Sequence, residues 1–316
     1  MFLPTPELLA AALLLDLLLA DPRWLPHPVV GIGRLIALQE RFYRRLGLDG
    51  YGGGLLLCCL TVLLTVAAAA TLLRLLQLLS PLLAQAAGVL LAWTCLAARS
   101  LHRESALVVA ALERDDLAAA RQLLSRIVGR DTADLDREAI LRAVVETVAE
   151  NSSDGIIAPL FWLTVAGPVG GLAYKAINTL DSMVGYRNER YDRMGWASAR
   201  LDDLANLLPA RLTALLMVAT APLVGLSAGN GWRIWQRDHG NHPSPNSGHP
   251  EAAAAGVLGV RLGGGSFYGG VFKDKPCLGD PARPLDIAAY RGAVRLMYAA
   301  TIAMTLLGIA FLTVLQ

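Results

Sequence analysis

The stretch GGLLLCCLTVLLTVAAAATLLRLLQLLSPLLAQAAGVLLAWTCLAA, residues 53–98, decides the fold class. Arg74 is its one charged residue. A helix that crosses a membrane needs about 20 mainly apolar residues. Ser80-Pro81 divides the stretch into two segments of that kind, because proline starts a helix readily but cannot continue one. The sequence therefore predicts a membrane-embedded helical hairpin, with Arg74 near enough to its end for the charge to reach water.

The composition of the whole chain agrees with this prediction. Of 316 residues, 54% are hydrophobic and 17% are charged, with a mean hydropathy of +0.46. A soluble domain has about 25% charged residues. The net charge of +2 and the 6% aromatic content exclude a nucleic-acid-binding surface. The four cysteines have neither zinc-ligand spacing nor the pattern of a disulfide framework.

Hydrophobic periodicity predicts helix nearly throughout, without a convincing strand pattern. We therefore expect an all-α, polytopic integral membrane protein that forms a single membrane-embedded domain over residues 1–316. The N-terminal segment lacks a basic region and a cleavage site, so we expect it to be retained. The segments apolar enough to be membrane helices are 4–20, 53–79, 81–98, 156–174, 207–229 and 293–315.

Three polar blocks separate these segments: 21–52, 99–155 and 230–292. Arginine excess places 21–52 in the cytoplasm, and the hairpin returns 99–155 to the same side. Block 99–155 is predicted to be a cytoplasmic insert of two amphipathic helices, with breaks at Gly129 and near Asp131. Block 230–292 is predicted to be a polar loop rich in glycine and proline.

Segments 156–174 and 207–229 contain prolines, and the first also contains Gly167-Pro168-Val169-Gly170-Gly171. Broken helices of this kind line polar cavities in membrane proteins. If both segments span, 175–206 faces outward; if both re-enter, all polar blocks share the cytoplasmic side. We favour re-entry, and labelling of a cysteine at position 190 from outside intact cells would contradict it.

Residues 175–211, KAINTLDSMVGYRNERYDRMGWASARLDDLANLLPAR, combine a lysine and five arginines with acidic and amide side chains. Ionisable groups beside apolar segments indicate function. On helices, the i, i+3, i+6 spacing presents a cation, a carboxylate and an amide on one face. Such faces could hold Mg²⁺ while the cations bind phosphate. The alternative is internal salt bridging, as between Arg200 and Asp203. The residues with this spacing are Lys175, Asn178 and Asp181, and then Arg200, Asp203 and Asn206, with Asp202 four residues before Asn206.

A second motif, Glu146 to Gly155, places Glu146 and Glu150 one helical turn apart, where they repel unless a cation or a raised pKa relieves them. Asn151 and Asp154 follow in a cap or turn that opens the next apolar segment. The alternative pairs Arg142 with Glu146 on a solvated face.

The third motif is DHGNHPSPNSGHPE, residues 238–251. Its prolines and glycines predict an irregular loop with exposed amides that could bind an anion, and Glu251 opens an alanine-rich helix. Its three histidines lack helical HxxxH spacing, which disfavours zinc. Neither a Walker A motif nor a Rossmann fingerprint occurs, so any ATP site is of a non-standard type.

Over nearly its whole length the chain resembles the CobD/CbiB family of cobalamin biosynthesis, the adenosylcobinamide-phosphate synthases. Four motifs in the family's order carry the resemblance. They are DPRWLPHPV (21–29), ENSSDGIIAPLFW (150–162), the 175–211 stretch, and SPNSGHPEAAAAGVLGVRLGG (244–264).

The resemblance implies an enzyme of the cytoplasmic (inner) membrane with its polar loops mainly in the cytoplasm. It would use ATP and Mg²⁺ to join adenosylcobyric acid to (R)-1-amino-2-propanol O-phosphate or a related amino alcohol. Its partners would be the corrinoid, the amino-alcohol phosphate, the lipid bilayer and other membrane enzymes of late cobalamin assembly, without nucleic acid. Because a carboxylate is a poor electrophile, ATP would first convert it to an acyl phosphate, which the amine then attacks.

We assign roles on this basis. Replacing Asp181 or Asp203 by alanine is expected to abolish activity and leave a folded protein. Glu150 or Asp154 is the candidate general base that removes the proton from the amine. The predicted catalytic residues are Glu150, Asp154 and Lys175; the predicted Mg²⁺ ligands are Asn178, Asp181, Asp202, Asp203 and Asn206; the predicted nucleotide- or substrate-binding residues are Asn151, Arg187, Arg200, Arg211, Ser244, Asn246 and Glu251.

Two other functions are compatible with parts of the sequence. Aspartate-rich motifs between helices also occur in Mg²⁺-dependent prenyl or phosphoalcohol transferases, but the polar block 230–292 fits that class poorly. Broken helices also occur in transporters. The long polar loops and the absence of an inverted repeat in the sequence disfavour a transporter.

Overall fold

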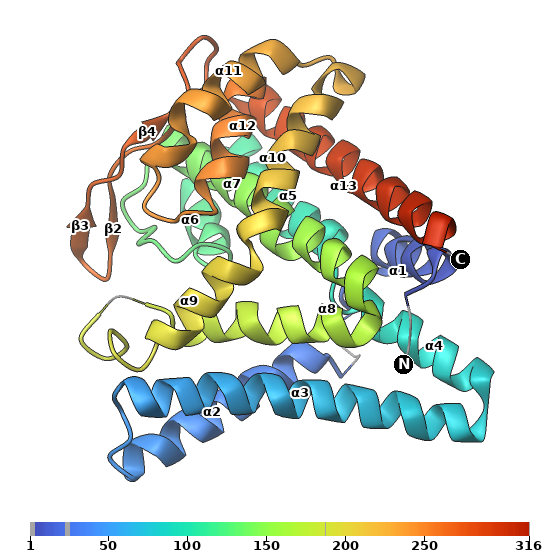
Figure 1. The fold of residues 1–316 in the computed structure, drawn as a ribbon. Coiled ribbons are helices and arrows are strands. Elements are labelled where there is room, and N and C mark those ends of the chain that lie inside the picture. Colours follow the sequence, from blue (N-terminus) through green and yellow to red (C-terminus); the bar gives the residue numbers. More distant parts are fainter. Residues whose placement is uncertain (1–3, 23–25, 187, 316) are drawn as a thin grey trace. The chain divides into compact units, whose positions relative to one another are not determined.

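The computed structural model describes residues 4–22, 26–186 and 188–315, which are mainly helical (Figure 1). These residues form two compact units that alternate along the chain. Unit 1 contains residues up to Ala97, Ala158–Asn206 and the chain from Thr305; unit 2 contains Ala98–Ile157 and Leu207–Met304. Each unit is built from several separate segments of the chain, so this division does not define two consecutive domains. The expectation of a single domain stays a prediction.

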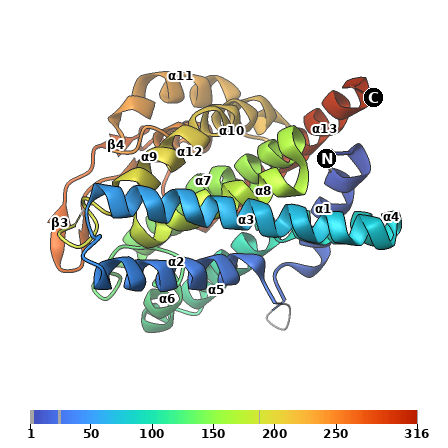
Figure 2. The same ribbon diagram turned by 60° about the horizontal axis from the view of Figure 1, so that its bottom comes forward.

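Unit 1 is built around one very long apolar helix. Its N-terminal end packs closely, since a Cβ at Gly54 would lie 2.1 Å from the Met194 carbonyl oxygen. A buried cluster that includes Ile36, Leu57 and Leu180 joins α2, α3 and α8. Figures 1 and 2 show α2 lying beside α3. The helices of unit 1 are α1 (Pro6–Leu19), α2 (Pro28–Arg45), α3 (Tyr51–Leu79), α4 (Pro81–Trp93), α8 (Ala158–Val184), α9 (Trp196–Ala205) and the end of α13 (Ile287–Leu315).

The predicted hairpin is confirmed: α3 and α4 are in contact and are separated by Ser80 alone. The polar block 21–52, for which no particular helix was predicted, contains α2 over much of its length. This helix is amphipathic, with Ile32 and Ile36 on its buried side, and its arginines obscure that pattern in the sequence.

The predicted break in segment 156–174 is present. At Ala166 and Gly167 the backbone leaves the helical conformation, and Gly167 has a φ of 64°, in the left-handed region that glycine tolerates. Pro168 then starts the second arm of α8, and the chain turns sharply between the arms (Figure 1). The break is consistent with re-entry, but the membrane path of this segment stays a prediction.

Unit 2 packs helices around a completely buried helix, α12. Its alanines and Gly256 let neighbours approach, since a Cβ at Gly256 would lie 2.9 Å from the Gly231 Cα. Its elements are α5 (Ala98–Glu113), α6 (Leu117–Leu124), α7 (Arg137–Ser152), the π-helical turn η1 (Ser153–Ile157), α10 (Leu207–Thr220), η2 (Ala221–Val224), α11 (Ala228–Asp238), η3 (His239–Asn241), α12 (Gly248–Leu258), β1 (Leu262–Gly263), β2 (Ser266–Tyr268), β3 (Val271–Lys273), β4 (Cys277–Leu278) and the first part of α13.

Two predictions for unit 2 need correction. Block 99–155 contains three helices and not two, although the break at Gly129 and Asp131 is where it was expected. Block 230–292 is not a simple loop, since it contains α11, α12 and four short strands. β1 pairs antiparallel with β4, and β2 with β3. The Asp131 carboxylate accepts the amides of Gly269 and Gly270 (3.0 and 2.7 Å), which fixes the tight β2–β3 turn.

Five helical segments in the described ranges are long and apolar enough to cross a membrane. They confirm an all-α, polytopic membrane protein. The 14-residue α1 is not among them, although its sequence was one of the six apolar segments considered. The five segments are Tyr51–Leu79, Pro81–Glu113, Arg137–Val184, Leu207–Val224 and Ile287–Leu315.

Candidate functional site

Two groups of predicted site residues come together, one in each unit. The first, the amide–carboxylate cluster, consists of Asn178 and Asp181 on α8 with Asp202 and Asn206 at the end of α9. Packing positions this end of α9. Trp162 Nε1 donates to the Ala205 carbonyl (3.2 Å) from the first arm of α8. Both arms of α8 therefore build the cluster, because the second carries Asn178 and Asp181.

Hydrogen bonds hold Asn206 in one orientation. The buried Tyr174 hydroxyl donates to Asn206 Oδ1 (2.9 Å), and Asn206 Nδ2 donates to Asp202 Oδ2 (3.0 Å). Asn206 is only 1% exposed. In this geometry Asn206 holds Asp202 in place through its amide nitrogen, and its predicted role as a metal ligand stays a prediction.

Asp202 is the unusual member of the cluster. Burial, then the nearby Asp181 carboxylate, raise the pKa of Asp202 to about 7, although Asn206 and Asn178 act in the opposite direction. Its Oδ1 is sealed from solvent and accepts no hydrogen bond within the described part of the chain. A buried oxygen without a donor is costly. A hard divalent cation between Asp181 and Asp202 would relieve both that cost and the repulsion.

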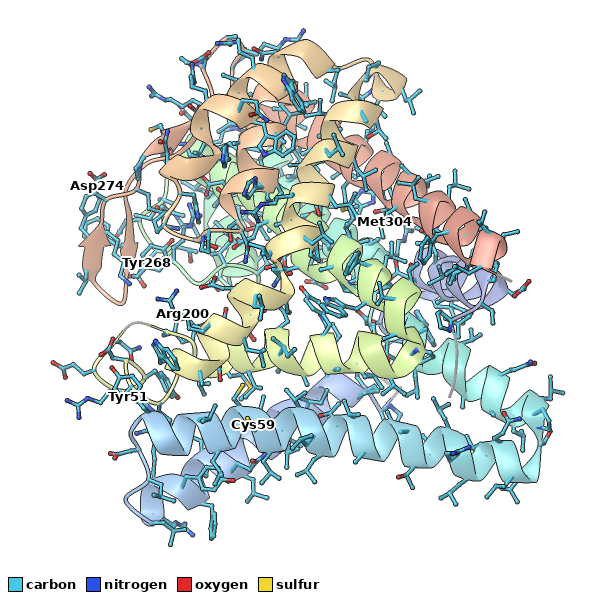
Figure 3. The ribbon with its side chains drawn as sticks, in the orientation of Figure 1. Tyr51, Cys59, Arg200, Tyr268, Asp274 and Met304 are labelled. Carbon is cyan, nitrogen blue, oxygen red and sulfur yellow. The ribbon has the colours of Figure 1, made fainter. Side chains whose placement is uncertain are left out.

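The oxygen donors fit Mg²⁺, which proteins often hold through one or two carboxylates, with water and substrate phosphates completing the shell. Residues 4–22, 26–186 and 188–315 contain no group of three or more His, Cys, Asp or Glu side chains placed to hold a metal ion. The use of all three aspartates as ligands therefore stays a prediction. Asp203 instead faces Arg200, with its Oδ2 3.7 Å from Arg200 Nη1, which is the salt-bridge alternative. Arg200 itself is exposed on α9 (Figure 3).

The second group, the glutamate cavity, lies in unit 2 and has a volume of about 260 Å³. Three glutamates, Glu146 and Glu150 on α7 and Glu251 on α12, share it with cationic and polar side chains. The lining also includes Arg130, Asn151, His242, Gly263, Gly264, Tyr268 and Lys275.

Glu146 is the best-compensated carboxylate of the cavity. It is 4% exposed, forms an ion pair with Arg130, and accepts the Gly263 amide (2.7 Å). The alternative that paired it with Arg142 on a solvated face was wrong, because Arg142 binds Glu138 (2.8 Å). Although burial opposes it, Glu146 raises the pKa of Arg130. Arg130 therefore stays charged beside the cavity.

Glu150 and Glu251 are less compensated. Ser247 Oγ donates to Glu150 (3.0 Å) from the loop before α12. Burial, then Glu150 and Glu146, raise the pKa of Glu251 well above its usual range. His242 Nε2 lies 3.6 Å from Glu251 Oε1, but burial, then Lys275, lower the pKa of His242 to about 4. Near neutral pH His242 is uncharged, so it does not neutralise Glu251. Because the pKa of Glu251 is raised, this carboxyl group can take up a proton.

The remaining predicted residues are distributed over both units. Asn151 lines the glutamate cavity, with its Nδ2 donating to the Thr147 carbonyl (3.0 Å). Asp154 lies in η1, and Lys175 lies on α8 one turn before Asn178. Arg187 lies outside the described residues.

The predicted anion-binding loop is largely occupied with itself. Ser244 Oγ accepts the amides of Asn246 and Ser247 (3.3 and 3.2 Å). Arg211 Nη1 donates to the Leu207 carbonyl (2.6 Å) of its own helix. Ser244, Asn246 and Arg211 do not line the glutamate cavity. His242 from the loop and Glu251 from α12 do line it.

Sequence reasoning missed Arg130, Lys275 and Tyr268 as site residues. Lys275 and Tyr268 come from the β2–β4 region, with the Lys275 ammonium 5.5 Å from the Tyr268 ring centre. Arg130 follows Gly129 in a break between helices, which gives a weak signal. Only the fold brings these three segments to α7.

The fold and these two groups define a class: a polytopic helical membrane protein with a buried carboxylate cluster and a cavity lined by three glutamates and by cationic side chains. The family model described as CobD/Cbib protein matches residues 9–297. The chain is 60% identical over 316 residues to "Cobalamin biosynthesis protein CobD" of Pelobacter propionicus, covering 100% of this chain and 98% of the relative. It is 46% identical over 300 residues to "Cobalamin biosynthesis protein CbiB" of Salmonella typhimurium, covering 94% of each.

A more distant relative, "Cobalamin biosynthesis protein CobD" of Clostridium perfringens, is 43% identical over 279 residues, covering 87% of each chain. No solved structure matches the chain. The chain belongs to the CobD/CbiB family, which confirms the resemblance seen in the sequence. A role in cobalamin biosynthesis follows.

Proposed function

We propose that the chain is an ATP-dependent amide ligase that joins adenosylcobyric acid to (R)-1-amino-2-propanol O-phosphate or a related amino alcohol, giving adenosylcobinamide phosphate. One observation carries the reaction type. The glutamate cavity combines two carboxyl groups, Glu150 and Glu251, with the cations Arg130 and Lys275, and burial raises the pKa of Glu251. Amide formation through a phosphorylated acid needs both functions, because an amine must lose a proton while phosphate charge is neutralised.

The chemistry balances in two steps. A carboxylate oxygen of the corrinoid attacks the γ-phosphorus of ATP, the bond from that phosphorus to the β,γ-bridging oxygen breaks, and ADP leaves. The amine nitrogen then attacks the acyl carbon, the C–N bond forms, and the C–O bond to phosphate breaks. The nitrogen's proton passes to the Glu150–Glu251 pair. Phosphoryl transfer needs positioning and charge neutralisation more than a covalent residue.

The amide–carboxylate cluster supports a role for Mg²⁺. Asp181 and Asp202 would hold the ion, with Asn178 beside them, and Asn206 would orient Asp202. Bound there, Mg²⁺ would neutralise phosphate charge. Lys175 on the same helix supplies a further cation for phosphate. We place the enzyme in the cytoplasmic membrane with its polar blocks on the cytoplasmic side, where ATP is available.

The test is turnover by the purified full-length protein in detergent with the corrinoid acid, the amino-alcohol phosphate, ATP and Mg²⁺. We expect one ADP for each amide formed. AMP and pyrophosphate in place of ADP would overturn the acyl-phosphate step. No amide under any condition would overturn the ligase; lipid product without ATP use would favour a transferase, and substrate uptake into vesicles without turnover a transporter.

A further inference from the structure

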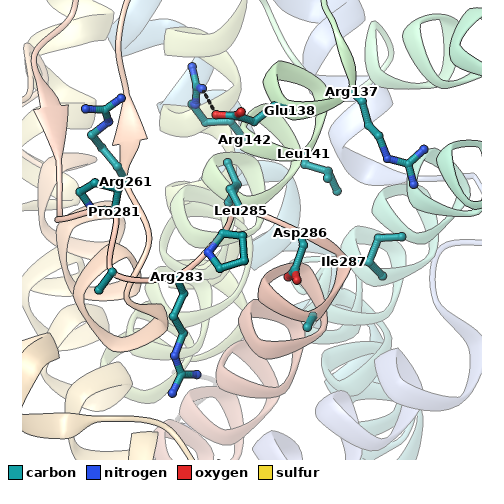
Figure 4. Close-up of a pocket in the computed structure, with 13 residues that line it drawn as sticks. Arg137, Glu138, Leu141, Arg142, Arg261, Pro281, Arg283, Leu285, Asp286 and Ile287 are labelled. Carbon is teal, nitrogen blue, oxygen red and sulfur yellow. Dashed lines mark hydrogen bonds and ion pairs between the residues drawn. The ribbon is translucent and has the colours of Figure 1, made fainter.

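A second hollow in unit 2, with a volume of about 750 Å³, lies where α7 and α13 begin (Figure 4). We call it the arginine pocket because four arginines line it. They come from three separate parts of the chain: α7, the residue before β1, and the segment before α13. These arginines are Arg137, Arg142, Arg261 and Arg283.

The four arginines differ in what they already bind. Arg137 Nη1 donates to the Leu112 carbonyl (2.7 Å) and to Asp115 (3.0 Å), and Arg142 forms an ion pair with Glu138 (2.8 Å). Within the described ranges, the guanidinium groups of Arg261 and Arg283 make no hydrogen bond or ion pair. Two cations thus remain available to a ligand.

The acidic residues of the pocket do not cancel this charge. Glu138 is engaged by Arg142, and the Asp286 carboxylate accepts the Ala289 amide (2.9 Å) as the cap of α13. Four arginines against these two acids leave the lining with an excess of two positive charges. Guanidinium groups suit phosphate because their planar donors bind its oxygens in pairs.

Apolar side chains form the rest of the lining, and in Figure 4 the Arg261 and Arg283 side chains extend in opposite directions from the neighbourhood of Leu285, so that a ligand bound by both would span this part of the pocket. The volume is in the range of small-molecule sites, about 300–1,000 Å³. A bare phosphate ion would use little of it. The pocket therefore fits a phosphate ester with an apolar part. The apolar lining residues are Leu141, Pro281, Ala282, Pro284, Leu285, Ile287 and Ala288.

The arginine pocket also adjoins the glutamate cavity. Arg142 lies one turn before Glu146 on α7, and Arg261 precedes Gly263 and Gly264, which line the cavity. A Cβ at Gly264 would lie 3.9 Å from Arg142 Nη1. The two hollows thus share a wall made of α7 and the 261–264 segment.

We propose that the arginine pocket binds a phosphate-bearing organic anion with at least two negative charges, held mainly by Arg261 and Arg283. Two sources supply this chemistry. One is a nucleoside triphosphate, which would reach the neighbouring glutamate cavity, and the other is the headgroup of an anionic phospholipid beside the apolar helix α13. The nucleotide source rests on the proposed function, and the binding site itself does not.

The experiment measures binding to the full-length protein. One arm titrates ATP in detergent without Mg²⁺, which leaves a metal-dependent site out of the readout. The other arm measures retention of cardiolipin or phosphatidylglycerol by native mass spectrometry. The variant is Arg261→Gln/Arg283→Gln. The control, Arg114→Gln/Arg126→Gln, removes the same charge from exposed arginines of unit 2 outside the pocket.

We expect at least a tenfold loss of affinity in one arm for the pocket variant and less than a twofold change for the control. The arm that responds identifies the source. Equal binding by wild type and pocket variant in both arms, or equal losses in both variants, overturns the proposal. Because no turnover is needed, amide synthesis can fail while this binding persists, and binding can fail while synthesis persists.

Discussion

The amide–carboxylate cluster and the glutamate cavity both bring acidic side chains together, but they differ in how the negative charge is compensated. In the cluster, Asp202 accepts a hydrogen bond from the Asn206 amide, while its other carboxylate oxygen is buried and has no hydrogen-bond donor among the described residues. In the cavity, Glu146 has Arg130 and a backbone amide, while Glu150 has a serine hydroxyl. Similar residues thus suit different chemistry: we propose that the first group takes up a cation from outside and that the second exchanges a proton.

The largest effect is expected for Asp202→Asn. An amide preserves shape and the contact with Asn206 but removes the charge that would hold Mg²⁺. Amide synthesis should fall by roughly a thousandfold, about 4 kcal/mol in transition-state stabilisation. Asp192→Asn, at an exposed position in unit 1, is the control and should retain wild-type rates. Near-normal turnover in Asp202→Asn would contradict the proposal that the cluster binds Mg²⁺. Asp203→Asn should cost less than tenfold, since Asp203 faces Arg200; this replaces the expectation from the sequence that loss of Asp203 abolishes activity.

Glu146→Gln tests whether the cavity's best-compensated carboxylate is structural. It leaves the Arg130 guanidinium, whose side chain is 15% exposed, without its counter-charge. Breaking a buried ion pair from one side costs about 3 kcal/mol or more. A clear decrease in the thermal midpoint in detergent is expected. Glu138→Gln breaks the exposed pair with Arg142 and should cost under about 1 kcal/mol. Equal midpoints for the two variants would contradict the contrast.

Glu251→Gln tests proton exchange in the cavity. Because Gln cannot accept the amine's proton, kcat should fall by about a hundredfold while the KM for ATP changes little. The residual rate should rise with pH, since free amine then becomes available without a base. A variant with wild-type kcat and an unchanged pH profile would exclude Glu251 from the proton transfer.

The smallest effect concerns pH and His249. Trp235 Nε1 donates to His249 Nδ1 (2.9 Å), and burial, then Arg211, lower the pKa of His249 to about 4 from 6.5. Since the unfolded chain takes up a proton below 6.5 and the folded chain only near 4, stability should fall as pH drops across this window. His249→Asn keeps an acceptor for Trp235 and removes the titration. It should reduce the change in unfolding free energy across this pH window by about 1–3 kcal/mol, which is measured as a flatter dependence of the thermal midpoint on pH. An unchanged slope would reject the assignment.

The membrane-embedded helical class could be predicted from the sequence alone, because apolar run length and proline positions are local properties. It also predicted the hairpin at Ser80, the break at Gly167 and the two acidic motifs. It did not reveal α2 or the order within block 230–292, where charged residues and glycines mask elements that tertiary packing stabilises.

How each acidic residue is buried and compensated becomes visible only in the folded structure. The sequence treats Asp202 and Asp203 alike, yet one oxygen of Asp202 is sealed while Asp203 faces Arg200. It places Arg142 near Glu146, whereas the fold brings Arg130 and the Gly263 amide to that carboxylate. Burial and pairing depend on segments distant in the chain, so charge compensation, and with it the chemistry of each carboxylate, belongs to the folded state.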